Sequence, residues 1–97
     1  MTARIAGAID GVADAERIFR EEGCSAPRSW SNAPGDRYGA HSHADHKVLF
    51  CLDGSVTFHT AEGDAELHAR DRLDLPPGTE HAARVGPDGV ECIEAWR

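Results

Sequence analysis

From Gly23 onward the chain is built of short apolar or alternating segments separated by glycine, proline and acidic turns. Short segments bounded by such residues are typical of β-strands rather than helices. Strands that are brief and evenly spaced favour a sandwich or a barrel. The predicted strands span residues 28–32, 37–43, 47–52, 55–60, 65–69, 72–75, 80–85 and 90–96.

Turn residues predict how these strands connect. Asp53 and Gly54 predict a hairpin turn between the segments on either side of them, and residues 62–64 predict another. The Pro-Pro-Gly run at 76–78 predicts a sharp corner. Residues 47–52 are apolar on both faces, so one face should line the interior and the other should be covered by a second sheet, a helix or a partner subunit.

One helix is predicted, over residues 12–22. Val12, Ala15, Ile18 and Phe19 recur at helical spacing on one face, and Gly23 follows as a natural C-cap. We interpret this helix as a lid packed over the sheet. The expected organisation is one domain over residues 1–97, with a possible arm at 1–11, the helix at 12–22 and a barrel at 27–97.

Composition limits the partners and the location. The chain has 97 residues, the size of one small domain, and 17 acidic against 10 basic residues give a net charge of −7. Such a balance disfavours binding to nucleic acid. The apolar runs are too short to cross a bilayer and no signal-peptide core is present, so we expect no membrane partner and a cytoplasmic location.

Three cysteines, Cys24, Cys51 and Cys92, are widely spaced and contain no C-x-x-C pair. An odd number without close pairing argues against a disulfide framework or a thiolate zinc site. We expect reduced thiols, with Cys51 and Cys92 as small core residues.

The histidines are the chemically informative residues. His41 and His43 lie one residue apart, so in an extended strand they share a face and can chelate one metal ion. His81 lies downstream and could join them. The alternative for each is a core histidine bonded to backbone or water. His46 is offset by an odd number of residues and is not expected to be a fourth ligand, and His59 and His68 are expected at the surface.

The spacing around these residues resembles two motifs of the cupin superfamily. The first matches at Gly35, His41, His43 and Gly54, and Lys47 stands where the family has a glutamate. The second motif matches at Pro76, Gly78 and His81. Arg70 stands where the family has a glycine, and Val85 stands where the family has an asparagine. Together the motifs cover about half of the chain.

This resemblance implies an all-β fold, a double-stranded β-helix or jelly-roll barrel, here with one N-terminal helix. It also implies a homodimer and a pocket that holds a divalent metal. Carried over residue by residue, the implied ligands are His41, His43 and His81.

Lys47 is the main departure from the family pattern. An ammonium cannot coordinate a cation, so either the lysine turns away and leaves three imidazoles, or no metal binds. Lys47 could pair with Asp45 or another surface carboxylate, or it could contact an anionic ligand or act as a base. Tyr38 is the second candidate for proton transfer. The candidates for the pocket wall are Tyr38, Cys51, Phe58 and Trp96.

Two functions remain open from the sequence. In the first, three imidazoles hold zinc, iron, nickel or copper, and the site processes a small anionic molecule by oxygenase, isomerase or lyase chemistry. In the second, the barrel is a non-catalytic module that binds or senses a small ligand without a functional metal. The sequence does not decide whether the chain is an enzyme.

Overall fold

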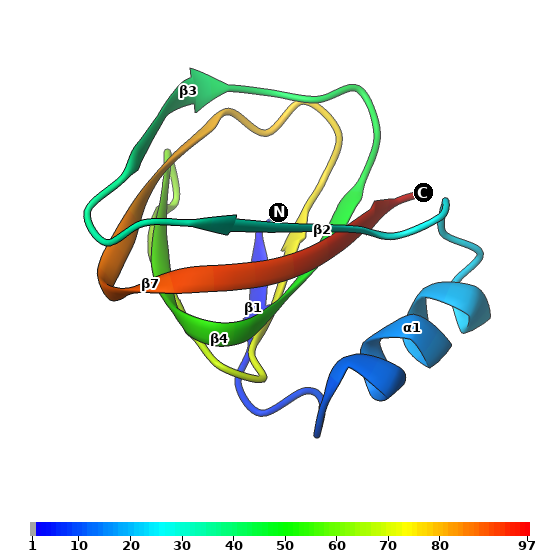
Figure 1. Cartoon of the computed structure of the whole chain (residues 1–97). Coiled ribbons are helices and arrows are strands. Elements are labelled where there is room, and N and C mark those ends of the chain that lie inside the picture. The colour runs from blue at the N-terminus through cyan, green and yellow to red at the C-terminus, as the bar shows by residue number, and fades with distance from the viewer. Residues whose placement is uncertain (1) are drawn as a thin grey trace.

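Two long antiparallel strands, β4 (Lys47–Thr60) and β7 (His81–Trp96), form the frame of the barrel in this computed structural model, which describes residues 2–97 (Figure 1). They pair along their whole length, from Lys47 opposite Trp96 to Thr60 opposite His81. The shorter strands extend this frame on both sides. These are β1 (Ala3–Ile5), β2 (Arg28–Asn32), β3 (Arg37–His41), β5 (Gly63–His68) and β6 (Arg72–Leu75).

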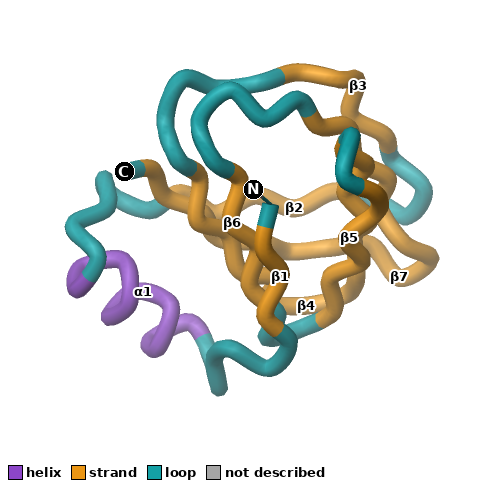
Figure 2. Tube along the Cα trace, turned by 180° about the vertical axis from the view of Figure 1, so that it is seen from behind, coloured by secondary structure: helices purple, strands orange, loops and turns teal. Residues whose placement is uncertain are grey.

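The hydrogen-bonded order is β1-β6-β4-β7-β2, with β3 paired to β7 and β5 paired to β4. The predicted all-β barrel with one helix is confirmed. Strands β2 and β6 have the predicted bounds, and β4 and β5 join through the predicted turn near residue 62. Residues Ala3–Ile5 pair with β6, so this part of the expected arm belongs to the sheet (Figure 2).

The hairpin predicted at Asp53 and Gly54 is wrong. The two flanking segments form one continuous strand, β4, which bends where its register to β7 shifts. Gly54 has φ +72°, and a Cβ at this position would lie 2.0 Å from the carbonyl oxygen of Gly89. The glycine is therefore required by the close approach of β7 at a bend, and not by a chain reversal. The segments predicted at 80–85 and 90–96 likewise join as β7.

Helix α1 (Val12–Glu21) lies outside the barrel wall (Figure 1). Phe19 is buried and packs edge-on against Phe50, with ring centroids 5.4 Å apart. Val48 and Ile93 complete the apolar layer beneath the helix. The helix thus covers the outer apolar face of β4. A helix was one of the three possibilities predicted for covering this face, beside a second sheet and a partner subunit. Among residues 2–97 no helix has the length and apolar character of a membrane span.

The second apolar cluster fills the barrel interior. Leu49, Leu67 and Leu73 are completely buried there, as are Cys51 and Cys92, which face each other across β4 and β7. Both are free thiols, as predicted. A hydrogen bond with Cys51 and burial raise the pKa of Cys92, so its thiol stays protonated. This packing fills the middle of the barrel and leaves one end for polar residues.

Candidate metal centre

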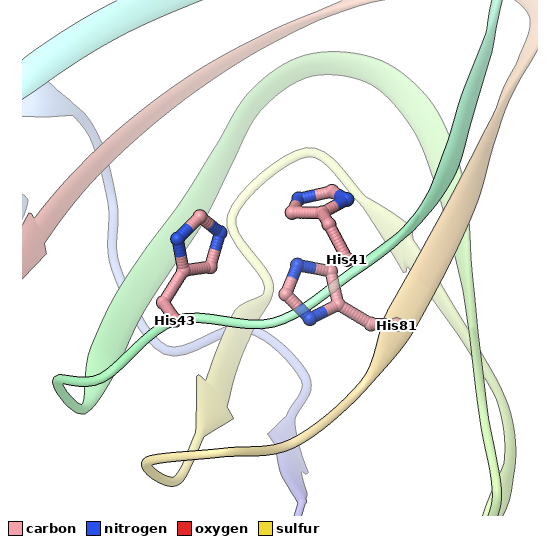
Figure 3. Close-up of side chains that lie close together, drawn as sticks. All are labelled: His41, His43 and His81. Carbon is pink, nitrogen blue, oxygen red and sulfur yellow. The ribbon is translucent and has the colours of Figure 1, made fainter.

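Three imidazoles, those of His41, His43 and His81, lie close together (Figure 3). His41 ends β3, His43 follows in the next loop and His81 begins β7. His41 lies opposite His81 in the β3–β7 register. One nitrogen from each ring lies within 4.8 Å of the others. The structure therefore brings together the three histidines that the sequence singled out.

The corner at residues 76–78 holds two of these histidines in place. The Gly78 backbone N–H donates to the His43 carbonyl at 2.8 Å, which ties the His43 loop to the corner. Gly78 has φ +76°, a conformation that favours glycine. Immediately after the corner, Thr79 supplies the carbonyl that orients His81. The predicted corner thus contributes directly to the site.

Backbone carbonyls fix two of the rings. Nδ1 of His41 lies 2.8 Å from the Gly39 carbonyl oxygen, and Nδ1 of His81 lies 3.0 Å from that of Thr79. Because a carbonyl can only accept, Nδ1 is the nitrogen that carries the proton in each of these contacts. The lone pair is then on Nε2, the arrangement found in histidines that ligate metals.

The facing nitrogens of His43 and His81 lack partners. Nε2 of each ring is buried and makes no hydrogen bond to any residue in the described range 2–97. Buried polar atoms normally have a partner, so these two need an explanation. Burial lowers the pKa of both histidines, which keeps them neutral and able to coordinate at pH 7. The donor set fits a divalent transition metal.

Lys47 pairs with Glu94 in the cavity that the three histidines also line. Its Nζ lies 3.3 Å from Glu94 Oε1 and 4.7 Å from the centre of the Trp96 ring. The same carboxylate oxygen accepts a hydrogen bond from Trp30 Nε1 at 2.7 Å. The expected partner, Asp45 or another surface carboxylate, is not the one used, because Glu94 is buried. Lys47 and Glu94 are both buried, with side chains 8% and 11% exposed.

Glu94 was missed by the sequence analysis. It lies on β7 beyond the second motif, and the β4–β7 register places it opposite Leu49 and diagonally across from Lys47. The signal in the sequence that could have pointed to Glu94 was Lys47, the chain's only lysine. A lysine that is buried in a barrel requires a nearby anion. The pair lies close to the imidazoles, so that burial and, in addition, the Lys47 charge lower the pKa of His43 and His81.

A cavity of about 260 Å³ opens beside the three histidines. Tyr38 and Phe58 line it, as predicted, together with Trp30 and Glu94. Cys51 instead belongs to the core, whereas Trp96 packs against the His43 ring at 4.6 Å. A larger hollow of about 580 Å³ lies elsewhere and contains one histidine, His68.

Tyr38, the second candidate for proton transfer, is at the edge of this cavity. Its ring packs edge-on against Trp30 at 5.7 Å, and its hydroxyl donates to the Asn32 side-chain carbonyl. Burial raises the pKa of Tyr38, so the phenol stays protonated at neutral pH. A role for Tyr38 or Lys47 in catalysis stays a prediction.

The remaining histidines lie outside the cluster and have carboxylate partners. His46 contacts Asp74 at 2.7 Å, so it is not positioned as a fourth ligand. The other two pairs, each at the surface, are His59 with Asp64 at 2.7 Å and His68 with Glu66 at 2.6 Å.

Comparison with known proteins identifies the family. The family model described as "Cupin domain" matches residues 29–93, about two thirds of the chain. The chain belongs to the cupin domain family. No curated protein sequence matches this cupin. Many solved structures, in contrast, are similar to it.

Three of these structures show the range of similarity. An RmlC-like cupin from Shewanella frigidimarina is 21% identical with a TM-score of 0.65, over 72% of this chain and 62% of that protein. A DUF861 family protein from Thermotoga maritima is 12% identical with a TM-score of 0.68, over 100% of both chains. The DMSP lyase DddQ from Ruegeria pomeroyi is 25% identical with a TM-score of 0.69, over 74% of this chain and 37% of that protein. This cupin spans about three fifths of the first structures it matches.

Proposed function

We propose that this cupin binds one divalent transition metal ion through His41, His43 and His81 and takes a small anionic molecule into the adjoining cavity. The observation that carries the proposal is the pair of buried Nε2 atoms, on His43 and His81, that have no partner within residues 2–97. Both belong to the three-histidine cluster. Zinc, iron, nickel and copper are the metals that suit such ligands.

Several residues around the proposed metal would have defined roles. The carbonyls of Gly39 and Thr79 hold two rings in the tautomer that leaves Nε2 free. When bound, a divalent ion with three neutral ligands polarises an anionic substrate or a water molecule. Glu94 would neutralise the Lys47 ammonium beside the ligands. The aromatic part of the cavity wall is formed by Trp30, Tyr38 and Phe58.

Whether the site is catalytic depends on a group that can move a proton. The lyase DddQ makes lyase chemistry a reasonable first reaction class to test here. A specific observation favours the alternative, a non-catalytic binding module. Lys47 is paired with Glu94 and the Tyr38 hydroxyl is bonded to Asn32, so both candidate groups are already engaged.

Metal analysis by plasma mass spectrometry tests the proposal. Tag-free wild-type protein should retain close to one equivalent of a transition metal, and His43→Ala and His81→Ala should lose most of it. His59→Ala is the matched control because His59 is a surface histidine paired with Asp64. Metal that survives in His81→Ala, or a wild type that cannot be loaded, would contradict the metal centre.

A further inference from the structure

Arg28 lines the same cavity as the three histidines. It begins β2, directly opposite Glu94 on β7. Residues directly opposite in an antiparallel pair project on the same face, as do residues two apart in one strand. Arg28, Trp30 and Glu94 therefore share the face that borders the cavity, and Arg28 is the solvent-exposed member.

The charge of Arg28 is not neutralised within the protein. Among residues 2–97 its guanidinium makes no hydrogen bond or ion pair, whereas the Glu94 opposite it is bonded to Lys47 and Trp30. Since Lys47 and Glu94 cancel, Arg28 leaves the cavity lining with one net positive charge. That charge stands out in a chain whose net charge is −7.

The chemistry of the cavity specifies the anion. A guanidinium is a planar fork that binds a carboxylate through two parallel hydrogen bonds. Trp30, Phe58 and Ala83 supply apolar wall beside it, and the volume of about 260 Å³ admits only a small molecule. A doubly charged phosphate would bring a second negative charge near Glu94, and among the charged side chains of residues 2–97 that line the cavity only Arg28 is left unpaired to offset it.

We propose that Arg28 is the specificity-determining residue of the cavity and that it binds the carboxylate of a small monocarboxylate whose apolar part lies against the aromatic wall. The inference deepens the proposed function and rests on it, since the ligand would occupy the space beside the metal centre. The contact to the anion, one of the roles that the sequence left open for Lys47, is thereby given to a residue outside both motifs.

Binding of propionate, propionamide and methyl phosphate tests the proposal. Titrations followed by tryptophan fluorescence are suitable because Trp30 lines the cavity. The titrations are made on wild type and on the variants Arg28→Gln, Arg28→Lys and Arg20→Gln. Each protein is measured both loaded with zinc and after treatment with a chelator. Arg20 is the matched control, an exposed arginine of α1 without an ion pair among residues 2–97.

Wild type should bind propionate at least about tenfold more tightly than propionamide, with or without zinc, as a charge-assisted contact requires. Arg28→Gln should abolish this preference, Arg28→Lys should recover part of it, and Arg20→Gln should behave as wild type. Zinc content should be equal in all variants.

An unchanged preference in Arg28→Gln would overturn the inference, as would a preference seen only with zinc, which would place the carboxylate on the metal. Tighter binding of methyl phosphate than of propionate would overturn the monocarboxylate class. Zinc content is measured in parallel, and failure of wild type to hold zinc would contradict the proposed metal centre. The preference for propionate over propionamide in the chelator-treated protein tests the role of Arg28 alone.

Discussion

At the scale of single residues, the pairing of Lys47 with Glu94 explains how a lysine can occupy the position of a cupin glutamate. A buried ammonium is costly unless an anion compensates it. Glu94 supplies that anion from the neighbouring strand, and the Trp96 ring adds a favourable contact. The Lys47 charge is thus compensated by an anion and an aromatic ring although it lies in the cavity that the histidines line.

We predict that Glu94→Gln destabilises the protein by about 3 kcal/mol or more, because it leaves the Lys47 charge buried without an anion. Urea unfolding measures this loss. Lys47→Met should also destabilise, and the double variant should lose clearly less than the sum of the two single losses. Additive losses would show that the two side chains do not act as a pair.

The sequence predicted the residues of the histidine cluster but not the charges around it. His41, His43 and His81 were identified because their spacing is local within each motif. Glu94 depends on the β4–β7 register, in which it lies opposite Leu49 and diagonally across from Lys47. A one-residue slip would turn Glu94 to the other face, so no local pattern could place it.

At the scale of elements, α1 covers the outer apolar face of β4 and β7. Its bounds were predicted to within one residue because an amphipathic pattern ending at glycine is a strong local signal. The same local reasoning misread Asp53 and Gly54. Whether a glycine marks a turn or a bend depends on the strand that approaches it, here through the Gly89 carbonyl.

We predict that Phe19→Ala costs about 3–5 kcal/mol of unfolding free energy, because it removes a buried ring that packs on Phe50. Chemical denaturation measures the loss. Metal content should not change, since this contact lies on the outer side of the barrel wall. Val12→Ala is the control on the same helix, where the side chain is 48% exposed and the cost should be small. Equal costs for the two variants would contradict the assigned packing.

At the scale of the whole molecule, an ion-pair network fastens the end of α1 to the barrel. Arg72 on β6 donates to both oxygens of Glu22, at 2.6 and 2.9 Å, and also to Asp74. Arg97 contacts Glu22 from the C-terminal end at 3.1 Å. These contacts connect segments far apart in the sequence, so composition and periodicity could not have predicted them.

This network predicts a loss of stability in acid. The hydrogen bond from Arg72 lowers the pKa of Glu22 below its usual value of 4.5. A carboxyl group whose pKa is lower in the folded state stabilises the fold above its unfolded pKa, and this contribution is lost as the pH falls through the folded pKa. Glu22→Gln should therefore be less stable than wild type at pH 7, and the difference should shrink below pH 4.5.

Urea unfolding across this pH range measures the effect. Glu16→Gln is the control, because Glu16 is exposed on the same helix and forms no ion pair within residues 2–97. Its difference from wild type should stay small at every pH. A Glu22→Gln difference that does not change with pH would contradict the role of this carboxylate.

The central claim is that His41, His43 and His81 bind one metal ion, and X-ray absorption at the zinc edge tests it most directly. Protein loaded with one equivalent of zinc should show three imidazole nitrogens at about 2.0–2.1 Å, with the remaining coordination by oxygen. His81→Ala should lose one imidazole or fail to hold the ion. A spectrum with sulfur ligands, or one unchanged by His81→Ala, would contradict the account.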